Sequence, residues 1–381
     1  MPVSPVRRNR RRRLAALAMI ITLLVTLSAG CWDFIEIERR AFVLAVGVDP
    51  GTTQKLRVTV QILVPIGVSP EGAAPTKPYR VLTFEADSLG DFTNQLISSL
   101  RHIIDFGHLT YIVLQEELAR PGLQEFEWFS RSLRLPGSVQ FMLTRDTSEA
   151  VVSATTPIDP IPATYVSEGA KRKEKTGSAV VYTTLREAFV RAFNNPLEDA
   201  FAQGLTSQKY GINFDGLAVF SQLKLAGWLD EDETSIFKLV QHSSAVHRYI
   251  TTHLDDGTRV TAESSGGRVG YGARLDEDGQ PTLWVKADLE VELKEAPGRA
   301  VSTTEAQHEI ESALAKEVQT KITDVIRKLQ GINSDPLGFG ERLRRRAPTY
   351  PDLGAWHDGV YQSVPLEVEV KVHMATRGFR R

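Results

Sequence analysis

A chain of 381 residues, of which 42% are hydrophobic and 24% charged, predicts two or three folded domains and excludes wholesale disorder. It contains one cysteine, which excludes an internal disulfide and a four-thiolate metal site. Six of the 45 basic residues and none of the 47 acidic ones fall in the first 30 residues, which leaves 39 bases against 47 acids. The remaining body is acidic, so nucleic acid is excluded as a partner, because phosphate binding needs a basic face.

The first 30 residues form a separate segment. Residues 7–13 read RRNRRRR, and residues 14–30 are uncharged and mostly apolar. A basic region followed by an apolar stretch and small residues is typical of a secretory signal. The apolar stretch is shorter than the roughly 20 residues of a comfortable membrane span. Because basic blocks stay cytoplasmic, we expect everything after this segment to be exported.

The only cysteine follows this segment directly. Its local sequence, LSAGC at residues 27–31, resembles a bacterial lipobox, in which the thiol receives a diacylglycerol and the chain is cut just before it. One departure is Ser28, because the lipobox pattern prefers leucine there. We therefore expect residues 1–30 to be a lipoprotein signal peptide and Cys31 to be the lipid attachment site, with acyl chains that anchor the protein in a membrane. The alternatives are an ordinary cleaved signal before a free thiol and an uncleaved anchor.

The first half of the body alternates strand patterns with helix patterns. Ser88 and Asp91 give a capping-box-like start to a helix whose apolar stripe includes Ile97. Residues 155–178, with three prolines followed by the charged run EGAKRKEKTG, predict an exposed connector. The other elements expected here are strands at 43–48, 56–63, 80–86 and 109–114 and helices near 115–133 and 146–154.

The second half is expected to end in a long helix and a final strand. The helix covers residues 303–330, begins with a capping box at Ser302 and Glu305, and carries apolar residues every three or four positions. The strand covers residues 366–374, LEVEVKVHM, where apolar and polar residues alternate. Before these two elements the sequence predicts a short helix near 183–194, a hairpin over 217–229 and strands through 240–293.

These patterns predict an α+β fold. Alternating strands are typical of antiparallel or mixed sheets that face water on one side, with helices packed on the other, and continuous apolar strands of a βαβαβ unit are not evident. After the lipoprotein signal peptide we expect three domains. They are an N-terminal α+β domain at 31–154, a connector or small middle domain at 155–211, and a C-terminal α+β domain at 212–381.

Motifs for catalysis and cofactor binding are absent from the sequence. It contains no GxxxxGK[ST], no HExxH and no GxSxG. The glycine-rich residues 266–272 do not match the dinucleotide fingerprint, and they predict a flexible strand or hairpin. Cys31 is better explained by lipid attachment than by nucleophilic catalysis. We therefore predict no catalytic residues, no cofactor-binding residues, no cofactor and a protein that is not an enzyme.

Metal ligands with a recognisable spacing are also absent from the sequence. His102 and His108 are six residues apart, and His242 and His247 are five apart, so neither pair shares a helix face. The acidic cluster at residues 230–233 lacks the glycine and glutamate that a calcium loop needs further on, and it predicts a solvated turn. We therefore predict no metal site.

Several short blocks along the chain share one resemblance. Residues 31–33 read CWD, and they are followed by AVGVD at 45–49, FGHL at 106–109, GLAVF at 216–220 and DPLGFG at 335–340. In this order the blocks resemble the Ger(x)C family, the C subunits of spore germinant receptors, across nearly the whole chain after the signal segment.

The resemblance implies a lipoprotein on the outer face of the spore inner membrane, with a fold of three α+β domains. It implies assembly with two membrane subunits, an A-type subunit and a transporter-like B-type subunit, in a receptor that responds to small nutrients and starts germination. Only Cys31 has a role that carries over, since the family offers no catalytic residues. We expect a non-catalytic scaffold, with the nutrient pocket on a partner subunit.

Alternatives stay open for the function and for single residues. A lipid-anchored extracytoplasmic solute-binding protein fits the signal segment, but such proteins are doubly wound with parallel strands. A lipid-anchored hydrolase is the third class, and the missing nucleophile motifs argue against it. His108 is a structural histidine or a ligand. Residues 338–340 are expected to form a turn that ends a helix and packs one aromatic ring. The arginines at 342–346 form a solvated face or contact anionic lipid.

Overall fold

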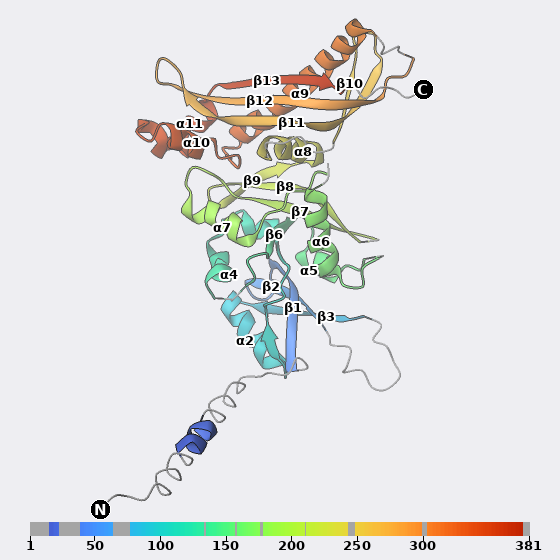
Figure 1. Cartoon of the computed structure of the whole chain (residues 1–381). Coiled ribbons are helices and arrows are strands. Elements are labelled where there is room, and N and C mark those ends of the chain that lie inside the picture. The colour runs from blue at the N-terminus through green and yellow to red at the C-terminus, as the bar shows by residue number, and fades with distance from the viewer. Residues whose placement is uncertain are drawn as a thin grey trace, which may run out of the picture.

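Two β-sheets follow one another along an elongated molecule (Figure 1). The computed structural model describes residues 15–22, 39–63, 77–132, 135–156, 158–175, 178–209, 211–242, 248–298 and 303–375. Helices and strands are mixed throughout these ranges, which confirms the predicted α+β class. Within the same ranges, none of the helices combines the length and the apolar character that crossing a membrane requires.

The first sheet runs from Arg40 to Leu229 and is mixed. Its four central strands, β1, β5, β6 and β7, are parallel, whereas β2, β3, β8 and β9 join at the flanks in antiparallel pairs. The strand order is β3 (Tyr79–Ala86), β2 (Leu56–Leu63), β1 (Arg40–Pro50), β5 (Tyr111–Gln115), β6 (Gln140–Thr144), β7 (Phe201–Gln208), β8 (Gly211–Ser221) and β9 (Lys224–Leu229), and the short β4 (Ile103–Asp105) pairs with β1.

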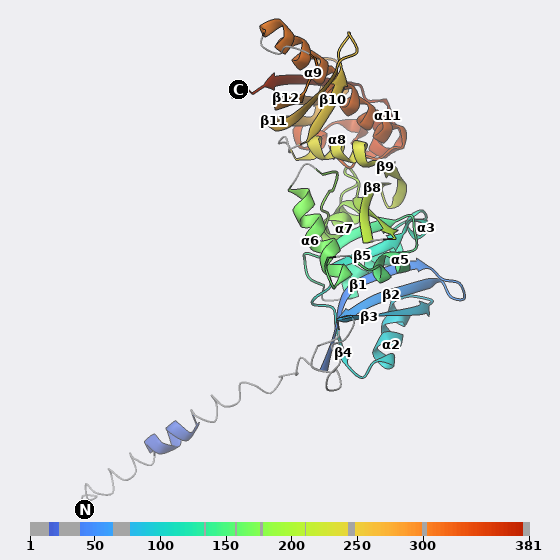
Figure 2. The same ribbon diagram turned by 90° about the vertical axis from the view of Figure 1, so that its right-hand side faces the viewer.

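Helices cover both faces of the first sheet (Figure 2). Neighbouring residues of a central strand are therefore buried on opposite faces, as Met142 and Leu143 of β6 show by joining two different cores. The expectation of helices on one face only is wrong for this sheet, because parallel strands need crossover connections that place helices on both faces. One face packs against α2 (Leu89–Ser99), α3 (Glu116–Ala119), η4 (Gln124–Phe126), α4 (Glu127–Ser132) and α7 (Leu185–Asn194), and the other against α5 (Ser148–Ser153) and α6 (Pro162–Glu174).

The segment expected to be an exposed connector contains a half-buried helix. In α6, Ala163, Val166 and Ala170 are buried against the first sheet at helical spacing. The buried Gln61 of β2 accepts a hydrogen bond from the N–H of Ala163 (3.1 Å) and donates one to the carbonyl of Val152 (3.0 Å), which ties α5 and α6 to the sheet. Small apolar residues among charged ones give a weak hydrophobic signal, and this is why the sequence predicted a connector.

The domain divisions expected at residues 154 and 211 stay predictions. Strands of the first sheet lie on both sides of residue 154, with β6 before it and β7 after it, and the division after residue 211 falls inside β8. Each of these strands pairs directly with the next one in the order.

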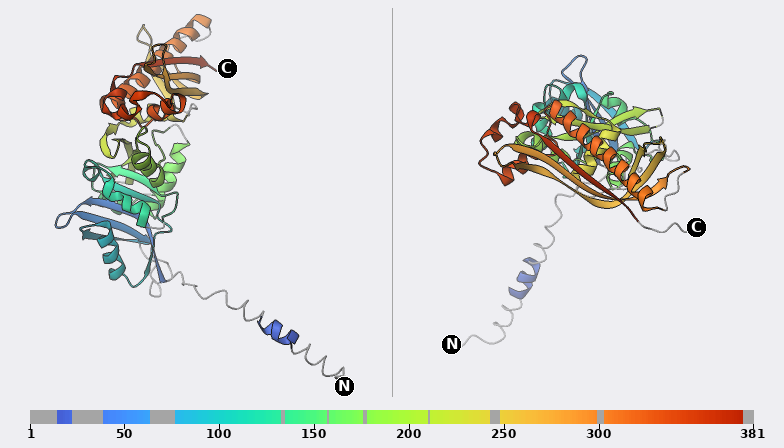
Figure 3. Two further views of the ribbon diagram at one scale, coloured as in Figure 1. Left: turned by 90° about the vertical axis from the view of Figure 1, so that its left-hand side faces the viewer. Right: turned by 90° about the horizontal axis from the view of Figure 1, so that it is seen from above.

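The second sheet has four strands and carries its helices on one face. β10 (Tyr249–His253), β11 (Arg259–Leu275) and β12 (Pro281–Glu295) are antiparallel, and β13 (Leu366–Met374) joins β12 in parallel. The glycine-rich residues 266–272 lie inside β11, which confirms the strand interpretation. The long α9 (Thr304–Gly331) lies across one face (Figure 3). The opposite face carries charged side chains.

The long helix α9 confirms its prediction apart from its cap. Thr303 caps it by accepting a hydrogen bond from the N–H of Ala306 at 3.2 Å, and the cap predicted at Ser302 lies outside the described residues. Ile310 and Leu314, among other residues of the apolar stripe, are buried against the second sheet. Three short helices then lead to β13: α10 (Phe339–Arg346), η5 (Pro351–Asp358) and α11 (Val360–Ser363).

A further helix, α8 (Glu231–Gln241), lies between the two sheets (Figure 1). The acidic cluster predicted as a solvated turn is its first turn. Asp230 accepts from the N–H of Glu233 and Glu233 accepts from the N–H of Asp230, both at 2.8 Å, which forms a capping box. Phe237 is buried in the core that joins β7 and β8 to the second sheet. Acidic residues stabilise the N-terminal end of a helix, and that signal was present in the sequence.

Candidate functional site

The predicted lipid attachment residue, Cys31, lies outside the described residues. The described chain resumes at Arg39, and β1 begins at Arg40. Cys31 is therefore nine residues before the first strand. Its predicted role stays a prediction.

His108 and His242, two of the histidines weighed as ligands, each contact a different side chain. His108 is exposed, and its ring meets Phe42 edge-on with the ring centroids 4.7 Å apart. His242 lies at the end of α8, where its Nε2 is 4.0 Å from a Glu174 carboxylate oxygen, and His247 lies outside the described residues. Among the described residues, no group of three or more His, Cys, Asp or Glu side chains is arranged to hold a metal ion.

The DPLGFG block forms the connection between α9 and α10. The Asp335 side chain is fully buried and accepts hydrogen bonds from the backbone N–H groups of Phe339 (3.0 Å) and Gly340 (2.8 Å). It accepts a third from the indole N–H of Trp356 (3.0 Å). Position 340 requires glycine, because a Cβ there would lie 2.6 Å from Trp356 Nε1. Asp335 therefore caps the first turn of α10 and holds η5 against it.

The predicted helix-ending turn at residues 338–340 instead begins a helix. Gly338 adopts φ +68°, a left-handed conformation that favours glycine, and α10 starts at the next residue. Phe339 packs edge-on against Tyr271 of β11 with the ring centroids 5.7 Å apart. The expected packing of one aromatic ring is therefore confirmed. The expectation that these residues end a helix is wrong, because α10 begins at Phe339.

Asp199 meets this connection from the first sheet. Its carboxylate accepts hydrogen bonds from the backbone N–H groups of Gln222 (2.6 Å) and Asp335 (2.7 Å), and its own N–H donates to the carbonyl of Asp335 (3.0 Å). The Ser334 hydroxyl donates to the carbonyl of Phe220 in β8. These bonds fasten the α9–α10 connection to the strands of the first sheet. Asp199, Asp335 and their partners are called the junction cluster below.

Burial dominates the electrostatics of the junction cluster. It raises the pKa of Asp199 to about 7 and the pKa of Asp335 to about 7, although the N–H donors favour the ionised carboxylates. The Nε2 atom of His357 lies 3.6 Å from Asp199 Oδ2, and burial lowers the pKa of the imidazole. Burial also raises the pKa of Tyr361 well above its usual value. The cluster therefore changes its charge near neutral pH.

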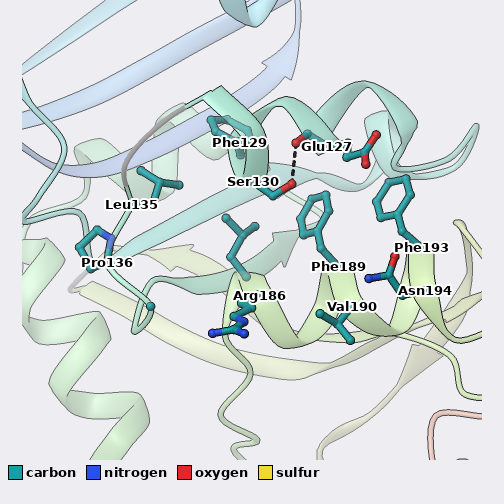
Figure 4. Close-up of a pocket in the computed structure, with 12 residues that line it drawn as sticks. Glu127, Phe129, Ser130, Leu135, Pro136, Arg186, Phe189, Val190, Phe193 and Asn194 are labelled. Atoms are coloured by element: carbon teal, nitrogen blue, oxygen red, sulfur yellow. Dashed lines mark hydrogen bonds between the residues drawn. The ribbon is translucent and has the colours of Figure 1, made fainter.

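A groove of about 500 Å³ lies between α4 and α7, on the side of the first sheet (Figure 4). Phe189 and Phe193 of α7 stack on each other with the ring centroids 5.5 Å apart, and Phe129 of α4 lines the opposite wall. The Ser130 hydroxyl donates to the carbonyl of Glu127, so it is engaged within its own helix. This lining is suited to an apolar group, and a catalytic arrangement is not formed by these residues.

The arginines of α10 all have partners within the chain. Arg344 and Arg345 pair with Glu341 at 2.7 Å and 2.9 Å. Arg342 lies over the Tyr271 ring at 3.8 Å, and Arg346 lies 6.0 Å from the centroid of Trp284. The sequence grouped these residues as one basic cluster but carried no information on these partners. It likewise gave no signal for Asp199, Trp356 and His357, which come together only in the folded chain.

Comparisons with known proteins extend over almost all of the body. Residues 33–206 match the family described as "Spore germination protein N-terminal domain", and residues 215–378 match that described as "Spore germination B3/ GerAC like, C-terminal". The chain is 23% identical over 410 residues to "Spore germination protein KC" of Bacillus subtilis (strain 168), with 97% of both chains covered. It is 21% identical to "Putative spore germination protein YfkR" of the same organism, with 92% of this chain and 93% of that one covered. Among solved structures, the crystal structure of the GerBC protein matches with a TM-score of 0.58 and 18% identity, covering 87% of this chain and 97% of that chain.

Proposed function

The chain belongs to the Ger(x)C family of spore germination proteins, and on this basis we propose that it is the lipid-anchored C subunit of a nutrient germinant receptor. In this proposal it is a non-catalytic scaffold on the outer face of the spore inner membrane. It assembles there with an A-type subunit and a transporter-like B-type subunit, and the complex triggers germination.

The main support for the proposal is the extent of the family matches. The two family matches cover residues 33–206 and 215–378, so the family body begins two residues after Cys31 and continues nearly to the last residue. A lipid on Cys31 would therefore tether this body directly to the membrane surface.

The junction cluster supports a scaffold role. Across the boundary between the two sheets, the N–H of Asp335 donates to the Asp199 carboxylate and the N–H of Asp199 donates to the carbonyl of Asp335. The helix α8 fills the space between the sheets with a shared core. Such a connection favours one rigid body over two lobes that close around a solute. A rigid, elongated body is suited to holding two membrane subunits in a fixed arrangement.

The test is a gentle-detergent pull-down of the tagged full chain from spore membranes, read by mass spectrometry, with Cys31→Ala in parallel. We expect the wild-type chain to carry a diacylglycerol on Cys31 and to recover a transporter-like polytopic protein and a second membrane subunit. We expect the Cys31→Ala chain to lose the lipid and the partners. Recovery of the lipidated chain without these partners would contradict the receptor assignment.

Titration calorimetry of the mature protein with amino acids and sugars tests the scaffold role separately. We expect no heat of binding, because the nutrient pocket lies on a partner subunit in this proposal. Direct binding of a nutrient with micromolar affinity would contradict the scaffold role and favour a solute-binding protein instead.

A further inference from the structure

Two large apolar side chains are exposed at one end of the first sheet. Ile97 of α2 is 56% exposed and Ile103 of β4 is 49% exposed. The spacing of the sequence places Ile97 in the buried stripe of α2, yet the structure turns it to solvent while the preceding Leu96 is fully buried. α2 packs against β4, so the two isoleucines belong to one corner of the molecule.

The composition of this corner differs from that of the rest of the body. Residues 92–104 contain one arginine, one histidine and no acidic residue, whereas the chain after residue 30 has an excess of acids. The acids that flank this range are Asp91 in the first turn of α2 and Asp105 at the end of β4, and the Asp105 carboxylate pairs with Arg40 at 2.6 Å. Ser98, Ser99 and Arg101 are exposed next to the isoleucines. Apolar side chains surrounded by small polar and basic ones are suited to the interface of a membrane with anionic headgroups.

The position of the corner brings it close to the expected anchor. β4 pairs with the start of β1, with Arg40 opposite Ile103. The nine residues from Cys31 to Arg40 span at most about 30 Å, since an extended chain covers roughly 3.3–3.6 Å per residue. The corner lies at the end of the molecule opposite the second sheet (Figure 1, Figure 2). A lipid on Cys31 therefore holds this end, and not the other, near the bilayer.

We propose that this corner, formed by Ile97, Ser98, Arg101 and Ile103, is a membrane-contact surface that inserts its two isoleucines among the lipid headgroups and acyl-chain ends. The inference rests on the proposed function, because it needs the lipid anchor on Cys31. The anchor supplies the attachment, and the corner sets the orientation, with the long axis of the body directed away from the membrane.

A lipid surface fits this corner better than a protein does. A stable protein interface buries about 800 Å² on each partner around a well-packed apolar centre. Two isoleucines separated by polar residues do not form such a centre. Shallow insertion into a bilayer needs no shape complementarity, and a weak contact is sufficient to orient a body that is already anchored.

The experiment uses the lipid-modified chain with single cysteines at the corner. Because Cys31 is the only cysteine and the lipid occupies its thiol, Ile97→Cys or Ile103→Cys supplies one free thiol for an environment-sensitive fluorophore. Each labelled chain is placed in vesicles of phosphatidylcholine and phosphatidylglycerol. Ile158→Cys is the matched control, because Ile158 is 85% exposed and precedes α6, which packs on the face of the first sheet opposite to α2.

We expect the fluorophores at positions 97 and 103 to shift to shorter wavelength and to be quenched by nitroxide lipids, while the fluorophore at position 158 stays in water and is quenched by iodide. Iodide quenching at all three positions, on chains that carry the lipid and float with the vesicles, would overturn the inference and leave the proposed function intact. Shielding of positions 97 and 103 only when the two membrane subunits are present would also overturn it, in favour of a protein contact. Absence of the lipid in the mass spectrum would overturn the proposed function itself.

Discussion

The two sheets of this molecule differ in how many of their faces are buried. In the first sheet, consecutive residues of β6 such as Met142 and Leu143 are both buried, because helices cover both faces. In the second sheet, Leu289 of β12 is buried and its neighbour Glu290 is exposed, because helices cover one face. The difference follows from parallel central strands in the first sheet and from an antiparallel hairpin in the second.

This comparison shows which parts of the molecule are free to make contacts outside it. The faces of the first sheet are occupied by its own helices, so its contacts are limited to its edges, its helices and the corner at α2 and β4. The second sheet leaves a whole face to solvent, where pairs such as Arg274–Glu367 (2.6 Å) and Lys286–Glu369 (3.0 Å) cross between strands. The hydrogen bonds of the junction cluster connect these two regions, so we expect them to determine whether the two sheets unfold together.

The largest effect is expected from Asp335→Ala. The change leaves three buried N–H donors without an acceptor, at a cost of about 1–3 kcal/mol each, and we expect the free energy of unfolding to fall by at least about 3 kcal/mol. The two sheets are then expected to unfold in two steps instead of one, as followed by denaturant titration with tryptophan fluorescence and circular dichroism.

Asp276→Ala is the matched control for this change. Asp276 also accepts backbone hydrogen bonds, from Asp278 (3.0 Å) and Gln280 (2.8 Å), but it lies in an exposed turn of the second sheet. Water replaces the lost acceptor there, so we expect a single transition close to that of the wild-type chain. If Asp335→Ala also unfolds in one step with little loss of stability, the junction cluster does not join the two sheets.

The sequence predicted the second sheet better than the first, and the reason is physical. Residues 366–374 alternate strictly, and alternation reports one buried face directly, so β13 was predicted with its correct bounds. In the first sheet, the strand predicted at 109–114 is confirmed as β5, but β6 is five residues long and buried on both faces, which gives no period to detect, and no strand was predicted there. In α6 the buried residues are mostly small, so its charged residues dominated the pattern.

The junction cluster could be predicted only in part. Asp335 stood out in the DPLGFG block, but its partners Asp199 and Trp356 lie 136 and 21 residues away in the chain. No local pattern in the sequence reports such long-range hydrogen bonds. The same holds for Ile97, whose spacing predicts burial, because exposure depends on what the rest of the chain leaves uncovered.

Alanine substitutions at neighbouring positions sharpen the comparison between the sheets. We expect Met142→Ala and Leu143→Ala each to lower the free energy of unfolding by about 2–5 kcal/mol, because each leaves a cavity in a different core. In β12 we expect a similar loss for Leu289→Ala and a change within about 0.5 kcal/mol for Glu290→Ala. Denaturant unfolding measures all four. A tolerated substitution at either Met142 or Leu143 would contradict the two covered faces.

The pH dependence of stability tests the charge of the junction cluster. The raised pKa values of Asp199 and Asp335, about 7 in the folded chain against the ordinary 3.8, mean that the native state binds more protons than the unfolded state between about pH 4 and pH 7. Their contribution to stability is therefore complete below about pH 4 and is lost as the pH rises to about 7. The lowered pKa of His357 acts in the opposite direction at the acidic end.

Asp335→Asn isolates this contribution, since it removes one titrating group and keeps one acceptor oxygen. We expect the difference in unfolding free energy, wild type minus Asp335→Asn, to fall as the pH rises from about 4 to about 7 and to stay level above that range. Thermal or urea unfolding at a series of pH values measures the difference. The contributions of other carboxylates with a shifted pKa, such as the arginine-paired Glu341, cancel in the subtraction. A difference that is constant over this range would show that the two aspartates titrate normally.

The smallest effect is expected on the open face of the second sheet. Arg274 and Glu367 are both exposed and their ion pair is screened by water, so we expect Arg274→Ala to change the free energy of unfolding by less than about 0.5 kcal/mol. Urea unfolding at low and high salt measures this change, and the salt should remove what little remains. A loss well above 1 kcal/mol would mean that the charged face stabilises the sheet as a packed face does. A small loss would instead mean that residues on this face can vary with little cost to the fold, because the stability of the sheet comes from the face that α9 covers.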